Sequence, residues 1–92
     1  MEKKVAVVGL GYVGLPLALT YVLGGFQVAG VDVDAQRIEA IRSASLGMRE
    51  DFDGVPVNDV LRRCLADGNL IVTSAFAELP ADIHTYIITV GI

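Results

Sequence analysis

Residues 5–14 read VAVVGLGYVG, an apolar run that leads directly into three glycines spaced G-x-G-x-x-G. A second apolar run, Phe26–Val31, follows, and it ends at Asp32, eighteen residues after Gly14. An apolar strand, a glycine-rich turn, a helix, a second strand and a terminal acid occur in this order and at this spacing in dinucleotide-binding βαβ units. This stretch therefore predicts a dinucleotide site at the start of an α/β fold.

Each residue of the motif has its own physical role in such a site. Gly9 permits the tight turn out of the strand, Gly11 lacks the Cβ that would block the pyrophosphate, and Gly14 lets the helix lie close to the sheet. The helix presents unpaired N–H groups and the positive end of its dipole to the phosphates. Asp32 is placed to accept hydrogen bonds from the adenosine ribose hydroxyls.

The surroundings of the glycines matter because glycine-rich turns also occur in α/β proteins that bind no nucleotide. Here the preceding strand is continuous and apolar, the following helix has a face of small residues, and the next strand ends in an acid at the required distance. This context favours nucleotide binding over a glycine-rich turn without a ligand.

The composition limits the class of protein. The chain has 92 residues, which is at most one small domain, and 53% of them are hydrophobic. That share exceeds the roughly 45–50% of typical soluble chains and fits parallel strands that are buried on both faces. The net charge is −4 and no basic run is present, which argues against a nucleic-acid surface because phosphate binding needs clustered Lys and Arg.

The single cysteine, Cys64, excludes an internal disulfide, and the chain offers no cluster of metal ligands, so we expect no metal site. The N-terminal residues 1–4 lead straight into the first apolar run without a signal-peptide pattern, and no apolar run is long enough to span a membrane. We therefore expect a cytoplasmic protein that contacts neither membrane nor nucleic acid.

Hydrophobic periodicity and turn residues give the expected secondary structure. The pattern predicts strands at 4–8, 27–31, 70–73 and 86–90, helices at 12–23, 34–43 and 57–66, and an irregular segment at 44–55. We expect Asp34 to cap the second helix. The residues expected to turn the first helix toward the sheet are Val13, Gly14, Leu17, Ala18 and Tyr21.

Strands that alternate with helices predict an α/β protein with a doubly wound parallel sheet of the Rossmann type. About four strands are present, in the expected order 3-2-1-4, so the second half of this fold is missing. We therefore expect residues 1–92 to be the N-terminal, dinucleotide-binding part of a longer multidomain protein.

Two longer strings make the assignment more specific. GLGYVGLP at 9–16, followed by GVDVD at 30–34, resembles the N-terminal NAD-binding domain of the UDP-glucose/GDP-mannose dehydrogenase family. These motifs are most similar to those of the branch that acts on UDP-N-acetyl amino sugars such as UDP-N-acetylmannosamine. Arg37 stands where that family has a basic residue beside the cofactor, and Tyr86–Val90 resembles the family strand that ends in V-P-T-P.

The resemblance implies NAD as cofactor and a nucleotide-sugar 6-dehydrogenase that oxidises a C6 alcohol twice to give a uronic acid, as in polysaccharide biosynthesis. It also implies a homodimer, and a catalytic cysteine, lysine and asparagine in later domains, so we expect no catalytic residue in this chain. The motif and the resemblance together give the candidate cofactor-binding residues, which are Gly9, Leu10, Gly11, Tyr12, Val13, Gly14, Asp32, Arg37 and Val90.

The chain departs from the family pattern at two places. The family's E-P-G-L before the third helix is replaced by Gly54–Val57, and V-P-T-P is replaced by Val90–Ile92. The first departure puts the contacts of that loop with substrate or cofactor in question. The second means that the threonine and proline of the family loop are absent.

Other reactive residues have simpler interpretations. Cys64 lies on the apolar stripe of a predicted helix, so a buried structural role is favoured over a nucleophile. His84 has no evident partner, and the acidic residues 50–53 fit a solvated loop better than a cation site. Arg37 could pair with neighbouring acids at the surface, but the resemblance favours a cofactor role.

Two other functions share the opening motif. Hydroxyacid and 6-phosphogluconate-type dehydrogenases usually read G-x-G-x-M-G, which the residues at 12–16 do not match. NAD-binding regulatory domains of potassium transporters also begin with G-x-G-x-x-G, but Tyr12, Pro16 and the long segment 44–70 disfavour them. We expect a nucleotide-sugar dehydrogenase and keep these two as alternatives.

Overall fold

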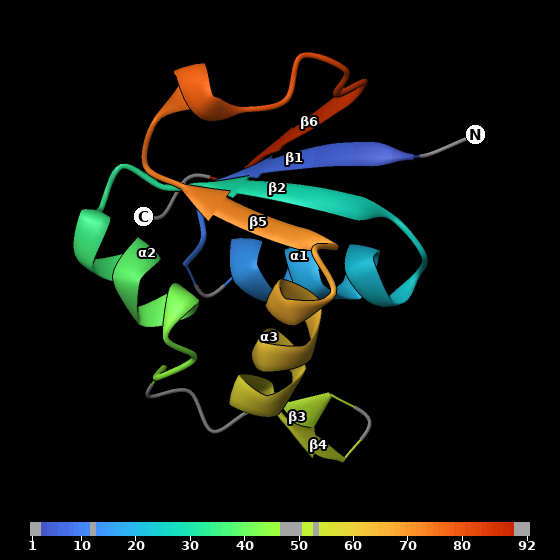
Figure 1. Cartoon of the computed structure of the whole chain (residues 1–92), viewed down its shortest axis with the longest axis vertical. Coiled ribbons are helices and arrows are strands. Elements are labelled where there is room, and N and C mark those ends of the chain that lie inside the picture. Colours follow the sequence, from blue (N-terminus) through green and yellow to red (C-terminus); the bar gives the residue numbers. More distant parts are fainter. Residues whose placement is uncertain (1–2, 12, 47–50, 53, 90–92) are drawn as a thin grey trace.

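The computed structural model describes residues 3–11, 13–46, 51–52 and 54–89, which form a four-stranded parallel sheet with helices packed on one face and a separate two-stranded antiparallel sheet (Figure 1). In chain order the elements are β1 (Lys4–Val8), α1 (Gly14–Leu23), β2 (Gln27–Val31), α2 (Ala35–Arg42), β3 (Asp51–Phe52), β4 (Val55–Pro56), α3 (Val57–Ala66), β5 (Leu70–Thr73), the 3₁₀ turn η1 (Phe76–Glu78) and β6 (Thr85–Ile88). The four-stranded sheet has the order β5-β2-β1-β6 (Figure 1). Counted along the main sheet, this is the predicted order 3-2-1-4.

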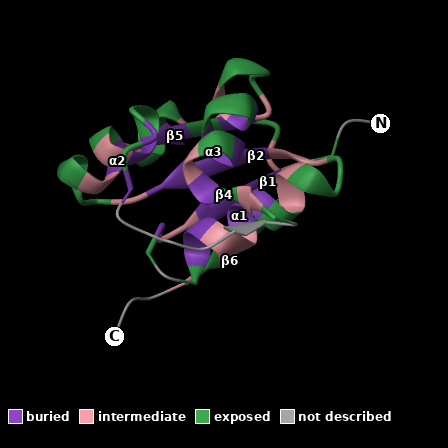
Figure 2. Cartoon of the chain, turned by 90° about the horizontal axis from the view of Figure 1, so that it is seen from below, coloured by how far each residue is buried: buried purple, intermediate pink, exposed green. Residues whose placement is uncertain are grey.

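The strands bury one apolar side against the helices. Val5 of β1 pairs in register with Val28 of β2, which in turn pairs with Leu70 of β5. These three side chains belong to one buried cluster that also contains Leu15 and Leu19 of α1. Full burial of an aliphatic side chain of this size stabilises the fold by about 1.5–3 kcal/mol. Figure 2 shows buried residues concentrated in the strands and on the helix sides that face them.

The orientation of α1 differs from the prediction. Gly14 and Ala18 are buried as expected, but Leu15 and Leu19 complete the buried face, whereas Val13 is 68% exposed. Each residue turns a helix by about 100°, so an error of one residue moves a side chain from the core to the surface. The close contact of Gly14 with Gly9, described below, sets this orientation.

The other sheet face is crossed by the segment that joins β5 to β6, which includes η1 (Figure 1). Lys4 Nζ donates a hydrogen bond to the Asp82 carboxylate at 2.6 Å and ties this segment to β1. That bond lowers the pKa of Asp82. Beyond the segment, Tyr86 and Ile88 of β6 are 52% and 70% exposed.

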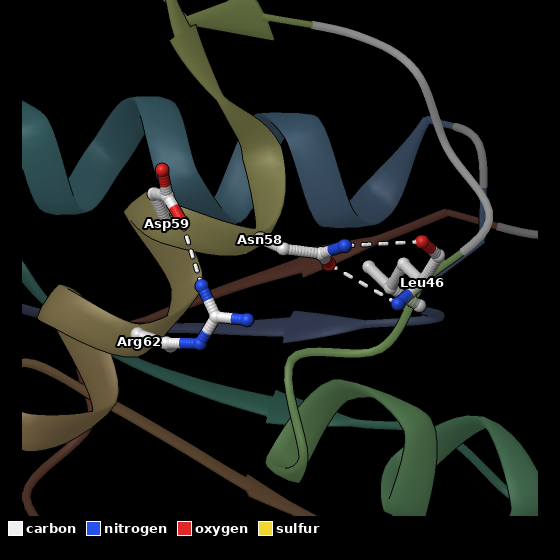
Figure 3. A network of polar contacts seen from close by, with 4 residues as sticks. All are labelled: Leu46, Asn58, Asp59 and Arg62. Atoms are coloured by element: carbon white, nitrogen blue, oxygen red, sulfur yellow. Dashed lines mark hydrogen bonds and ion pairs between the residues drawn. The ribbon is translucent and has the colours of Figure 1, made fainter.

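Residues 44–55 were predicted to be irregular, but two short strands, β3 and β4, pair there as an antiparallel hairpin. The hairpin lies beside the start of α3 (Figure 1). The chain before it is anchored by Asn58 of α3, whose Oδ1 accepts from the Leu46 N–H and whose Nδ2 donates to the Leu46 carbonyl, both at 3.1 Å (Figure 3). Local sequence gives no sign of this long-range amide contact.

Polar side chains complete the ends and the edge of the fold. Asp34 caps α2, as predicted, because its Oδ1 accepts from the N–H groups of Gln36 and Arg37. At the outer edge of the sheet, Arg42 Nη2 donates to the Val72 carbonyl of β5 at 2.8 Å. Within the described residues, no helix has the length and apolar character needed to cross a membrane.

Candidate functional site

The described residues 9–11, called the glycine turn below, lead from β1 toward α1 at the carboxyl end of the sheet. Gly9 has φ +95°, a left-handed conformation that side chains rarely tolerate. Its N–H donates to the Val31 carbonyl at 2.7 Å, which holds the turn against β2. A Cβ at Gly9 would lie 2.0 Å from the Thr89 carbonyl oxygen, so the chain after β6 also requires glycine here.

The other two glycines have opposite surroundings. A Cβ at Gly14 would lie only 1.6 Å from the Gly9 carbonyl oxygen, so the start of α1 touches the turn directly. A Cβ at Gly11 would meet no atom within 4 Å, and Gly11 is exposed. Of the three glycines, Gly11 is therefore the one whose missing side chain leaves room outside the protein.

The Asp32 carboxylate joins the end of β2 to the glycine turn. Its Oδ2 accepts from the Leu10 N–H at 2.8 Å, and its Oδ1 accepts from the Asp34 N–H at 2.9 Å. Both oxygens are thus oriented by backbone donors. Since each carboxylate oxygen can accept two hydrogen bonds, the group keeps capacity for further donors.

Arg37 approaches the same turn from α2. Its Nε donates to the Leu10 carbonyl at 2.7 Å, so the N–H and the carbonyl of Leu10 are held by Asp32 and Arg37. The Leu10 side chain is fully buried and packs against Gly30 of β2. A Cβ added at Gly30 would lie only 2.9 Å from Leu10 Cδ1. Leu10 therefore faces the site with its backbone.

A surface pocket of about 280 Å³ lies in front of the turn and is lined by Gly11, Asp32, Asp34 and Arg37. The structure thus brings together three of the residues expected to bind the cofactor. A second cavity of about 60 Å³ lies under the segment between β5 and β6, lined partly by Ile71, Pro80 and Ile83. Its volume is far below that of the pocket in front of the turn, which is close to the lower end of the roughly 300–1,000 Å³ usual for ligand pockets.

The remaining predicted cofactor residues fall in different places. Val13 is exposed directly before α1, and no side-chain hydrogen bond caps that helix within the described part of the chain. Tyr12 and Val90 lie outside the described residues. Thr89, which hydrogen-bonds to Gly9 in the turn, was not among the predicted site residues, and its only signal in the sequence was a single hydroxyl in an otherwise apolar predicted strand.

Cys64 is buried on the core side of α3. Burial raises the pKa of its thiol, Asp67 raises it further, and Arg63 opposes these effects. A protonated, enclosed thiol is a poor nucleophile, which agrees with the structural role expected for Cys64. His84 is exposed, and no group of three or more potential metal ligands comes together in the part of the chain that the structure describes.

Residues 3–92 match the model of the UDP-glucose/GDP-mannose dehydrogenase family, NAD binding domain. The chain belongs to this family. The predicted fold class, α/β with a parallel Rossmann-type sheet, is confirmed by the structure and by its likeness to a solved dehydrogenase. The prediction of an NAD-binding domain is confirmed by the family match. The match also decides against the potassium-transporter and hydroxyacid-dehydrogenase alternatives.

Individual relatives agree with the family assignment. The chain is 37% identical over 88 residues to a UDP-N-acetyl-D-mannosamine dehydrogenase of Methanococcus aeolicus, covering 96% of the chain and 18% of that protein. It superposes on a UDP-D-ManNAc dehydrogenase of Pyrococcus horikoshii with a TM-score of 0.82 and 32% identity, covering 95% of the chain and 20% of that protein. It also superposes on a UDP-glucose dehydrogenase of Pyrobaculum islandicum with a TM-score of 0.81 and 29% identity, covering 98% of the chain and 20% of that protein.

These coverages mean that the chain spans about a fifth of the length of the relatives it matches. What the whole protein acts on and assembles with is therefore a separate question from the identity of this domain.

Proposed function

We propose that this chain binds NAD for a nucleotide-sugar 6-dehydrogenase that oxidises the C6 alcohol of a UDP-sugar to a uronic acid. UDP-N-acetylmannosamine is the first substrate to test, because relatives with that name are 37% identical to the chain. The observation that carries the proposal is the pocket in front of the glycine turn, where the open side of Gly11 lies next to Asp32 and Arg37.

The described residues fit NAD in the following way. The Gly11 backbone and the N-terminus of α1, which no described side chain caps, suit the pyrophosphate. Asp32 has oriented oxygens with unused acceptor capacity for the ribose hydroxyls. Bound NAD would supply hydride acceptance, and the protein would supply position and electrostatics.

The other proposed contacts follow from the motif and the resemblance. We assign Gly9 and Gly14 to the geometry of the turn, Leu10 and Val13 to backbone contacts along the pyrophosphate, and Arg37 to the phosphate side of the pocket. Tyr12 and Val90, which lie outside the described residues, complete the proposed set of cofactor-binding residues.

The whole protein is proposed to act as a cytoplasmic homodimer whose product enters polysaccharide biosynthesis. This proposal rests on the family to which the chain belongs. Size measurement of the purified intact protein tests the dimer, and a monomer at assay concentration would overturn it.

The decisive experiment is an assay of the intact gene product with NAD against a panel of UDP- and GDP-sugars. We expect NADH formation with a UDP-sugar, two NADH for each sugar oxidised, and a uronic acid product. NAD binding by calorimetry tests the domain separately. Absence of NAD binding would overturn the proposed role of the pocket, whereas binding without turnover on any sugar would overturn the substrate class.

A further inference from the structure

The Thr89 side chain lies where the last strand of the sheet meets the glycine turn. Thr89 follows β6, and its N–H donates to the Val8 carbonyl at 2.8 Å, which continues the β1–β6 pairing. Its Oγ1 lies 2.8 Å from the Gly9 carbonyl oxygen and 3.2 Å from the Val8 carbonyl oxygen. A hydroxyl thus reaches from β6 to the turn.

A hydroxyl has one proton to donate. The Val8 oxygen already accepts the Thr89 N–H and is the more distant of the two carbonyls from Oγ1. The Gly9 oxygen is closer, so the Thr89 hydroxyl donates mainly to Gly9.

This hydrogen bond fixes a peptide plane that Asp32 also holds. The Gly9 carbonyl and the Leu10 N–H belong to the same planar peptide group. Thr89 holds its oxygen at 2.8 Å and Asp32 Oδ2 holds its N–H at 2.8 Å. The plane therefore cannot rotate without breaking a hydrogen bond on each side.

The next peptide plane is held by Arg37. Its Nε donates to the Leu10 carbonyl at 2.7 Å, and in a trans peptide the Gly11 N–H points opposite to that carbonyl. Side chains from α2, the end of β2 and the end of β6 thus orient the two peptides that lead to Gly11, which lines the pocket.

We propose that Thr89 is a positioning residue for the cofactor: its hydroxyl, together with Asp32 and Arg37, holds the glycine turn in the form that receives the pyrophosphate. The inference rests on the proposed NAD-binding function of this pocket. A turn that is already oriented does not lose conformational freedom when the ligand binds, and this raises affinity. Loss of the hydroxyl should lower NAD affinity although Thr89 lines neither pocket.

The test compares Thr89→Val, which keeps the shape and removes the hydroxyl, with Thr89→Ser, which keeps the hydroxyl and removes a methyl group. Thr85→Val is the control, because Thr85 is an exposed residue at the far end of the same strand. In the intact protein we expect Thr89→Val to weaken NAD by about three- to tenfold, the range of one neutral hydrogen bond. Thr89→Ser and Thr85→Val should bind like the parent.

Amide hydrogen exchange without NAD provides a readout that is independent of the ligand. In Thr89→Val the N–H groups of Gly9 and Leu10 should exchange faster. The N–H of Val28, which bonds to the Asn69 carbonyl on the other side of the sheet, should exchange as in the parent.

The outcomes separate this inference from the proposed function. A parent that binds no NAD overturns the proposed function, while the exchange rates still test the hydrogen bond. Parent-like NAD affinity and exchange in Thr89→Val overturn the positioning role. So does Thr89→Ser if it is more impaired than Thr89→Val, because packing of the methyl group would then be the cause. If Thr89→Val and Thr89→Ala both fail to fold while Thr89→Ser folds, the hydroxyl stabilises the whole domain and the specific role is also overturned.

Discussion

Gly11 and Gly14 are three residues apart, but a side chain would have different consequences at each. The space at Gly11 is open, so Gly11→Val should fold and lose NAD affinity by at least about a hundredfold, because charge-assisted phosphate contacts of roughly 1.5–3 kcal/mol each are blocked. Gly14→Ala should instead destabilise the fold by about 3 kcal/mol or more through overlap with the Gly9 carbonyl. Calorimetry with NAD and thermal unfolding distinguish the two. Undiminished NAD affinity in folded Gly11→Val would contradict the site.

Asp32 should decide between NAD and NADP. Its carboxylate suits the ribose hydroxyls of NAD but would repel the 2′-phosphate of NADP, and the next residue, Val33, brings no compensating charge. We expect Asp32→Ala to weaken NAD by roughly ten- to a hundredfold, from the loss of about 1.5–3 kcal/mol. The affinity for NADP should fall much less, or rise.

The structure adds a control for the Asp32 prediction, because Asp32 also accepts the Leu10 N–H. Asp32→Asn keeps an oxygen for that bond and removes the charge. Its affinity for NADP should therefore rise relative to its affinity for NAD, and the turn should be disturbed less than in Asp32→Ala. Titration of both cofactors against both variants measures this. An Ala variant with the full NAD preference of the parent would reduce Asp32 to a structural acid.

At the scale of the elements, the sequence predicted well what local patterns determine. The observed bounds of β1, β2, α3 and β5 agree with the prediction, because each is a periodic apolar run between turn residues. Helix α1 was predicted to begin at Tyr12, and the strand that is now β6 was predicted at 86–90 but spans Thr85–Ile88. Both ends adjoin the contacts of Gly9 and Gly14 with Thr89, and Thr89 lies 80 residues after Gly9 in the sequence.

The same distinction applies to the candidate site. Gly9, Gly14 and Asp32 could be predicted because their spacing is part of a recurrent motif. The bonds from Arg37 to Leu10 and from Thr89 to Gly9 join residues 27 and 80 positions apart. No local pattern in one sequence reports such pairs, and the hairpin at 51–56 was missed because its strands are only two residues long.

Helix α3 offers a test of such a long-range contact. Asn58→Ala removes both partners of the Leu46 backbone, which is partly buried, and should lower the free energy of unfolding by about 1–3 kcal/mol. Arg62→Ala is the control on the same helix, since its ion pair with Asp59 is exposed and should contribute within about 0.5 kcal/mol. Urea unfolding of the two variants measures the difference. Equal stabilities would show that Asn58 does not anchor the chain before the hairpin.

Across the whole molecule, the sheet is finished differently at its two edges. At β5, Arg42 bonds to an edge carbonyl, and α2 lies alongside. At β6, Tyr86 and Ile88 are exposed and the strand pairs with β1 on one side within the described residues. The pocket lies at the carboxyl ends of β1 and β2, where Gly11, Asp32 and Asp34 line it. In the proposed function, this domain binds NAD and the rest of the protein binds the substrate.

This division of labour predicts that the purified 92-residue chain will not oxidise nucleotide sugars. The chain spans about a fifth of the length of its relatives. Burial raises the pKa of the thiol of its one cysteine, Cys64, which disfavours the thiolate that a nucleophile needs. In the intact protein, Cys64→Ser should lower stability by about 1–3 kcal/mol and leave kcat unchanged. NADH formation from UDP-sugars, followed for the chain, the intact protein and this variant, tests both statements. Steady turnover by the chain alone, or loss of kcat in a folded Cys64→Ser protein, would place the chemistry inside these residues.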